Sequence, residues 1–239
     1  MTTLLEESLA LAREAGDTDR TVGALCNLGY ATLMQGDYER VSTLGNEALS
    51  LARDLGGTGM EALPEILINS ELASLQQGYH KQADASFKEA LAASEKARIK
   101  SSTINALEGM ASLAGVMGDA VGAAHLWGAA KAARGATGIA LPPGEQELHE
   151  PYLASARSQI GEAVWKEALT EGRAMSLEEA TQYGLSKELD SPATLVPEEL
   201  PDVEPAGDLT QREQEVAGLV AQGLTNRQGA QDSRSPSAP

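Results

Sequence analysis

Gln35-Gly36-Asp37-Tyr38 is the stretch that decides the fold, because versions of it recur along the chain. It is echoed by Gln77-Gly78-Tyr79 and by Gly118-Asp119, with steps of 42 and 40 residues between the glycines. Glu7-Ser-Leu-Ala-Leu-Ala-Arg13 likewise recurs as Glu47-Ala-Leu-Ser-Leu-Ala-Arg53, 40 residues later. A period near 40 residues, with a glycine turn between two helical stretches, indicates stacked helical hairpins.

Small or apolar residues follow each turn glycine at matching offsets: Val41, Gly45 and Ala48; Ala83, Phe87 and Ala90; Ala123, Trp127 and Ala130. A small residue five positions after the glycine lets the two helices of a hairpin approach closely, and a large residue four positions further on fills the space between hairpins. The next small residue, three positions later, lies on the same helical face. The predicted packing positions in the three units are Leu28, Gly29, Gly36 and Ala48; Gly78, Ala83, Phe87 and Ala90; and Gly118, Ala123, Trp127 and Ala130.

These offsets resemble the tetratricopeptide repeat (TPR) pattern, with loops lengthened to about 40 residues per unit. The resemblance covers residues 21–55, 64–98 and 103–136, and residues 2–15 resemble the second helix of a further hairpin whose first helix is absent. It implies a superhelical stack with a concave face, where a protein, a peptide or a small-molecule inducer would bind. The alternative is ordinary amphipathic helices whose spacing coincides, and three coherent units argue against it.

Composition supports an all-α protein and excludes several classes of partner. Aromatic residues make up only 3% of the chain, and no alternating run rich in valine or isoleucine occurs. The net charge of -17 opposes nonspecific binding to DNA or to an anionic membrane. A single cysteine, Cys26, permits no internal disulfide and fits a reducing cytoplasm. No apolar stretch approaches the ~20 residues that a transmembrane helix needs, so we expect a cytoplasmic protein with no membrane partner.

We divide the chain into four segments. Residues 1–138 hold the TPR-like repeats, residues 139–189 a helical capping segment, residues 190–208 an acidic, proline-rich linker that we expect to be disordered, and residues 209–239 a terminal motif with a disordered tail.

Three local signals organise the capping segment. Pro143 fits the first position of a helix, and Pro151 should kink or divide that helix. Ser176-Leu-Glu-Glu179 is a capping box, which predicts a short helix that ends near Leu185.

The terminal motif, Leu209-Thr-Gln-Arg-Glu-Gln-Glu-Val216 followed by Gly223-Leu-Thr-Asn-Arg-Gln228, has the pattern of helix, glycine turn and helix. Its amino-acid sequence resembles the start of the LuxR-type DNA-binding domain of bacterial transcription regulators. The resemblance implies that Thr225, Asn226 and Arg227 lie near the DNA backbone. The recognition helix of the family, which opens Ser-x-x-Thr-Val, does not follow; the chain continues from Gly229 with Ala-Gln-Asp-Ser-Arg-Ser. Base readout requires a helix in the major groove.

The amino-acid sequence of residues 123–185 and the terminal motif, taken together, resemble the C-terminal part of large, ATP-binding, MalT-like regulators of the LuxR family. In that group the corresponding region senses an inducer. We therefore expect the sensor portion of a transcription regulator, as a truncated product with weak or no DNA binding of its own, which would bind DNA only if the helix-turn-helix were complete. A free-standing TPR-type protein-interaction module is the alternative.

No constellation of catalytic residues stands out, and we expect neither an enzyme nor a bound cofactor. Gly56-Gly-Thr-Gly59 precedes Met-Glu rather than Lys-Ser/Thr, so it is not a phosphate-binding loop. His80 with Asp84, and Glu145 with His149, have the i,i+4 spacing of two ligands on one helix. Metal ligation needs three or four converging ligands, so surface histidines and no metal site are expected. Cys26 fits a small buried hydrophobe.

Overall fold

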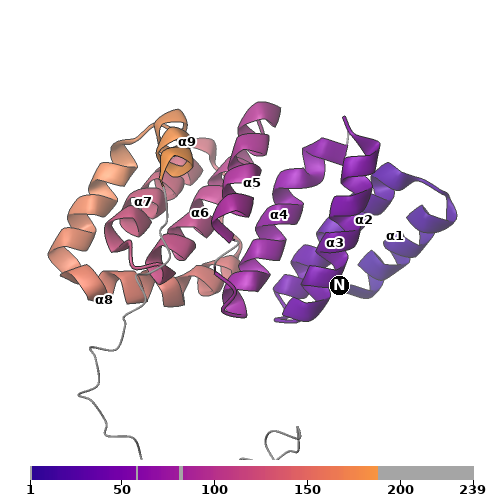
Figure 1. Cartoon of the computed structure of the whole chain (residues 1–239), viewed down its shortest axis with the longest axis horizontal. Coiled ribbons are helices and arrows are strands. Elements are labelled where there is room, and N and C mark those ends of the chain that lie inside the picture. Colours follow the sequence, from indigo (N-terminus) through magenta and orange to yellow (C-terminus); the bar gives the residue numbers. More distant parts are fainter. Residues whose placement is uncertain (1, 58, 81–82, 188–239) are drawn as a thin grey trace, which may run out of the picture. The chain divides into compact units, whose positions relative to one another are not determined.

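A computed structural model describes residues 2–57, 59–80 and 83–187, and the fold over these residues is all-α (Figure 1). The linker expected over 190–208, and the motif over 209–239 with Thr225, Asn226 and Arg227, lie outside the described residues.

The described helices follow one another with short connections. Their bounds are α1 Thr2–Glu14, α2 Thr18–Leu33, α3 Tyr38–Leu55, α4 Gly59–Gln76, α5 Ala83–Ala97, α6 Lys100–Val116, α7 Ala120–Thr137, α8 Pro143–Ala174 and α9 Leu177–Ser186.

Each helix from α1 to α7 packs against the next one in the chain, and consecutive even-numbered helices also pack against one another. Thus α2 contacts α4, α4 contacts α6, and α6 contacts α8. Figure 1 shows this succession from α1 to α7. The even-numbered helices begin at Thr18, Gly59, Lys100 and Pro143, so their starts are 41, 41 and 43 residues apart. This row of even-numbered helices brings side chains from four distant parts of the sequence together.

Glycines in the left-handed region end most of these helices. Gly36, Gly78 and Gly118 follow α2, α4 and α6 with φ values of 76°, 83° and 86°. Glycine adopts this conformation without the steric penalty of a Cβ atom, which lets the chain reverse at once. After two of these turns an aspartate caps the next helix: Asp37 accepts from the Arg40 amide and Asp119 from the Gly122 amide.

Arg98 is the exception to the glycine turns. It follows α5 with φ 58°, the only positive φ of a non-glycine residue in the part of the chain that the structure describes. We expect Arg98→Gly to raise the free energy of unfolding by about 0.5–1 kcal/mol, because glycine removes the left-handed strain. Urea unfolding would measure the gain. The matched control, Lys96→Gly in the last turn of α5, should lose about 0.5–1 kcal/mol, and an Arg98→Gly variant no more stable than wild type would contradict the prediction.

The packing residues predicted from the repeat are placed as follows. Ala83, Phe87, Ala90, Ala123 and Ala130 are fully enclosed, and Leu28, Gly29, Ala48 and Trp127 are also buried. The turn glycines Gly36, Gly78 and Gly118 are exposed at the helix ends. A side chain at Gly109 of α6 would collide with the Phe87 ring, so the large residue of one hairpin lies directly on the backbone of the next helix.

Helix α8 begins at Pro143, as predicted, and Pro151 lies inside it and does not divide it. The non-helical residue is Gly161, with φ 79° and ψ 162°. Pro151 and Glu147 are both exposed, so the Glu147 carbonyl that loses its helical donor can be hydrated. Beyond Gly161 the helix lies against α7, where a Cβ atom at Gly128 or at Gly172 would collide with the facing backbone.

The predicted capping box at the start of α9 is confirmed. The Ser176 hydroxyl accepts from the Glu179 amide at 3.2 Å, and the Glu179 carboxylate accepts from the Ser176 amide at 2.7 Å. Helix α9 packs against α5, α6 and α7. Just after it, Lys187 Nζ forms an ion pair with Asp119, the N-cap of α7, at 2.7 Å and donates to the Tyr183 hydroxyl at 2.9 Å. These contacts attach the capping segment to the last hairpin.

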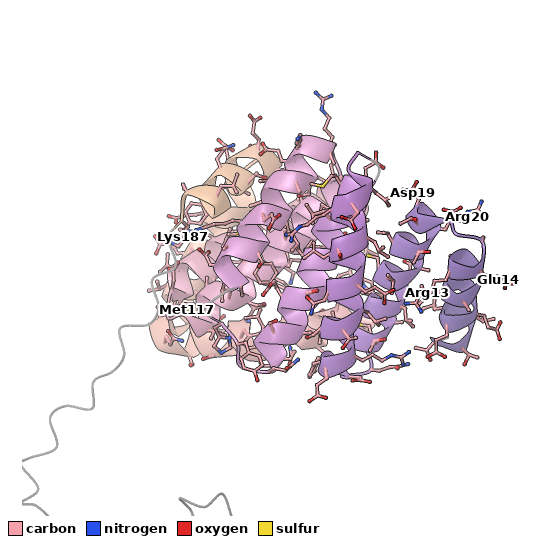
Figure 2. The ribbon with its side chains drawn as sticks, turned by 45° about the vertical axis from the view of Figure 1, so that its right-hand side comes forward. Arg13, Glu14, Asp19, Arg20, Met117 and Lys187 are labelled. Carbon is pink, nitrogen blue, oxygen red and sulfur yellow. The ribbon has the colours of Figure 1, made fainter. Side chains whose placement is uncertain are left out.

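At the other end, two ion pairs connect α1 to α3: Arg13 with Glu47, and Arg40 with Glu6. Figure 2 shows Arg13 on the opposite side of the described structure from Lys187 and Met117. Both pairs are exposed, so each contributes little to stability, about 0–1 kcal/mol. The two residues of each pair are 34 positions apart in the sequence, so α1 and α3 run in the same direction with the same offset at both contacts.

Candidate functional site

A cavity of about 70 Å³ lies among the even-numbered helices α2, α4, α6 and α8. Its polar lining residues are Tyr30, Glu65, Asn69, Asn105, Glu108, Glu145 and His149, and apolar side chains fill the spaces between them. Tyr30, Glu65 and Glu145 are half-buried, so the cavity opens to solvent on their side. We call this space the even-row cavity.

A buried ion pair forms its floor. Arg134, in the last turn of α7, donates through Nε to Glu108 Oε1 and through Nη2 to Glu108 Oε2, both at 2.6 Å. The two side chains are only 9% and 2% exposed. Arg134 also donates to Asn105 Oδ1 at 2.9 Å and to the Ala140 carbonyl at 3.3 Å. Burial opposes the charged guanidinium, but the Glu108 contacts outweigh it and raise the pKa of Arg134.

Glu65 and Asn69 lie one turn apart on α4, on the same helical face. Glu65 accepts hydrogen bonds from the Ser102 hydroxyl at 2.7 Å and from the Asn105 amide at 3.4 Å. No Lys or Arg of the described residues lies within ion-pair distance of Glu65. Asn69 is 6% exposed and lines the cavity, and within the described ranges its side-chain amide makes no hydrogen bond.

Glu145, in the first turn of α8, completes the carboxylate set. Its carboxylate is hydrogen-bonded with the Tyr30 hydroxyl and lies 3.8 Å from Arg134 Nη2. Burial raises the pKa of Glu145, and the charges of Glu108 and Glu65 add to this effect, while Tyr30 and Arg134 oppose it. Burial, with the Glu145 contact, also raises the pKa of Tyr30. Two carboxyl groups, those of Glu108 and Glu145, therefore lie within ion-pair distance of the Arg134 guanidinium, and the Glu65 carboxylate lines the same cavity without an ion pair among the described residues.

The prediction that His149 lies on the surface is wrong. His149 is 3% exposed, its Nδ1 lies 2.8 Å from the Ser112 hydroxyl, and its ring centroid lies 5.4 Å from that of Trp127. The α6–α8 contact encloses the ring, a tertiary effect that helical spacing alone does not reveal. Burial, with the nearby Arg134 charge, lowers the pKa of His149 to about 4.

The enclosed imidazole makes folding depend on pH. An unfolded chain protonates His149 below its ordinary pKa of 6.5, whereas the folded chain does so only near pH 4. The contribution of neutral His149 is therefore fully present above pH 6.5 and is lost as the pH falls towards 4, by about 3 kcal/mol. The raised pKa of Glu145 has the opposite effect, because it makes the folded state more stable as the pH falls. A variant that lacks the His149 imidazole is therefore needed to separate the two contributions.

We expect urea unfolding of His149→Gln, measured at intervals from pH 7 to pH 4, to show a smaller fall in the free energy of unfolding than wild type. Glutamine cannot take up the proton, so the difference between the two curves isolates the imidazole. Identical slopes for the two proteins would contradict the prediction.

His80, the other histidine with i,i+4 spacing to a carboxylate, is half-buried. His80 precedes α5 rather than lying on it, and Asp84 forms an ion pair with Lys88 at 2.7 Å. Over the described ranges no group of three His, Cys, Asp or Glu side chains is arranged to hold a metal ion. Cys26 is half-buried, and burial, with the Glu65 charge, raises the pKa of its thiol to about 12, which keeps it protonated.

None of the predicted packing residues lines the even-row cavity. Sequence reasoning missed Tyr30, Glu65, Asn69, Asn105 and Glu108 as a group. One signal could have indicated them: Glu65 and Asn69 interrupt the apolar run Leu63-Pro-Glu-Ile-Leu-Ile-Asn69, and Glu108 lies within the apolar α6. A charged residue in an otherwise buried helix needs a partner, and here Arg134 is that partner.

Comparisons with protein-family models, with curated proteins and with solved structures find no match to this chain. None of the helices within residues 2–57, 59–80 and 83–187 combines the length and apolar character that crossing a membrane requires.

Proposed function

We propose that the described helices form the sensor portion of a LuxR-family transcription regulator, built as a superhelical stack of TPR-like hairpins, and that the even-row cavity is its ligand site. The observation that carries this proposal is the cavity itself, in which four helices that begin about 41 residues apart direct polar groups into one partly enclosed space. Concave, partly buried spaces with a few convergent polar groups are the usual sites of small ligands. The resemblance of residues 123–185 and of the Leu209–Gln228 motif to MalT-like regulators of the LuxR family supports the regulatory part of the proposal.

A ligand that binds the folded state raises its melting temperature. We expect at least one member of a panel of cationic, neutral and anionic small molecules to raise the melting temperature of the full chain in a saturable way. The variant Asn69→Leu, which alters the cavity lining without changing charge, should lose this shift. Asn27→Leu, the same substitution at an exposed position of α2, should keep it. A panel without any saturable shift, or a shift that survives Asn69→Leu, would count against the sensor proposal.

We expect the chain to show no nanomolar, sequence-selective binding to duplex DNA. Its net charge of -17 opposes phosphate contact, and the sequence after Gln228 departs from the recognition-helix wording of the family. Fluorescence anisotropy with labelled duplexes at physiological salt measures this directly. Tight, selective binding that weakens with added salt would show this expectation to be wrong.

A protein-interaction module is the second candidate, favoured by the exposed apolar face of α1. Leu4 and Leu11 are 72% and 66% exposed, and their spacing of seven residues places them on one side of the helix. A stoichiometric protein partner that is lost from the double variant Leu4→Glu/Leu11→Glu, while Asn69→Leu retains it, would favour this candidate over the sensor.

A further inference from the structure

The even-row cavity carries unbalanced negative charge. Arg134 makes two hydrogen bonds to Glu108 and approaches Glu145 only at 3.8 Å. Glu65 accepts hydrogen bonds from two neutral side chains and has no cationic partner among the residues that the structure describes. Half-buried carboxylates favour a nearby cation, because their own solvation is incomplete.

Asn69 supplies a second, independent observation. It is 6% exposed, lines the same cavity, and forms no side-chain hydrogen bond in the described part of the chain. The Asn69 amide atoms are not among the fully buried side-chain atoms that lack a partner, so they are accessible from the cavity, where water or a ligand can satisfy them. Because Asn69 lies one turn from Glu65 on α4, its amide oxygen and the Glu65 carboxylate face the same space.

The dimensions and chemistry of the lining select the kind of cation. A space of about 70 Å³ holds on the order of five water molecules, enough for a compact head group with a short alkyl stem. The described carboxylates are not arranged as a metal site. An ammonium group has three donors and no acceptor, which matches two carboxylates and one amide oxygen.

We propose that the even-row cavity binds a primary alkylammonium group, with Glu65 and Glu145 as charge partners and Asn69 Oδ1 as the third acceptor. The inference rests on the proposed function in that the cavity is the ligand site of the sensor, and it names the chemical class of that ligand. The alkyl stem lies towards the opening beside Tyr30. The Arg134–Glu108 pair fixes the floor and keeps Asn105 in place beside Glu65.

The test uses ethylammonium chloride as the probe on the full chain, with the side-chain amide signal of Asn69 followed by nuclear magnetic resonance. A probe of only three non-hydrogen atoms cannot bind much more tightly than about the millimolar range, so saturation is expected there. Ethanol matches the probe in size but has no charge. Tetramethylammonium chloride has the charge but no N–H donor and too large a head group. Neither should produce a saturable shift.

The variant Glu65→Gln should weaken ethylammonium binding at least about tenfold, because it removes one charge partner. Glu61→Gln, the same substitution at an exposed position one turn earlier on α4, should bind like wild type. Thermal melts establish that both variants remain folded. Equal binding of ethanol and ethylammonium, unchanged binding to Glu65→Gln, or no saturable shift with ethylammonium would each overturn the proposal.

This failure is distinguishable from failure of the sensor function. If a neutral or anionic compound stabilises the wild-type protein but not Asn69→Leu, and ethylammonium does not bind, the cavity is still a ligand site. Only the proposal that its ligand is an alkylammonium group is then overturned. Absence of stabilisation by every class of compound contradicts the sensor function itself.

Discussion

We expect the replacement of Arg134 by methionine to lower the free energy of unfolding by about 3–5 kcal/mol, because it leaves the Glu108 carboxylate buried without its cation. Glu108 is 2% exposed and accepts two hydrogen bonds from the guanidinium. The substitution also removes the donors to Asn105 and to the Ala140 carbonyl. Methionine retains most of the apolar stem, so the loss reports the charge rather than the packing. Urea unfolding at neutral pH measures it.

The double variant Arg134→Met/Glu108→Leu is the informative companion. It removes both charges together, and replacing a buried ion pair by apolar residues of similar volume is often neutral or stabilising. We therefore expect the double variant to recover most of the lost stability. Arg173→Met, at an exposed position near the end of α8, should stay within about 0.5 kcal/mol of wild type. An Arg134→Met variant as stable as Arg173→Met would show that the pair does not hold the cavity floor.

Truncating Phe87 to alanine is the second large effect, a loss of about 3–5 kcal/mol. Phe87 is fully buried, and it contacts the backbone side of α6 at Gly109. The glycine leaves room for the ring, since a Cβ atom at this position would collide with it. The cavity that forms on truncation therefore lies between two rigid helices and collapses poorly. The loss appears in chemical unfolding as a lower midpoint with an unchanged slope.

Tyr79→Ala is the matched control for Phe87, because Tyr79 is an aromatic residue that is 68% exposed. We expect its free energy of unfolding to change by less than about 0.5 kcal/mol. The substitution Gly109→Ala, on the α6 side of the same contact, should also lower the free energy of unfolding by about 1–3 kcal/mol, because the new methyl group collides with the Phe87 ring. A Phe87→Ala variant that resembles Tyr79→Ala would contradict the proposed packing of consecutive hairpins.

The local elements of the fold were accessible from sequence because their causes are local. Gly36, Gly78 and Gly118 each end a helix with positive φ, since only glycine adopts that conformation freely. Pro143 starts α8, and the reciprocal bonds between Ser176 and Glu179 start α9. Each involves residues no more than four positions apart, so the sequence contains both partners side by side. The same reasoning did not decide whether Pro151 divides α8, because solvent exposure, a tertiary property, decides whether the lost helical hydrogen bond is tolerated.

The candidate site was not accessible in this way, because its contacts join residues far apart in the chain. Arg134 pairs with Glu108, 26 positions away; Ser112 contacts His149, 37 away; and Asn105 reaches Glu65, 40 away. Helical periodicity predicts which face of a helix is apolar but not which helix covers that face. His149 illustrates the difference, since its spacing from Glu145 fits an exposed face and the packing of α6 against α8 buries it.

The sequence alone therefore determined the helical class, a period near 40 residues and the positions of the turns, because backbone conformation depends on neighbouring residues. Only the tertiary structure decided which polar side chains meet among the even-numbered helices. It enclosed Glu108 with Arg134, and it left Glu65 without a cation and Asn69 without a hydrogen bond in the described part of the chain. Burial turns these ordinary polar residues into a candidate site, because a group taken out of water needs a partner that an exposed one does not.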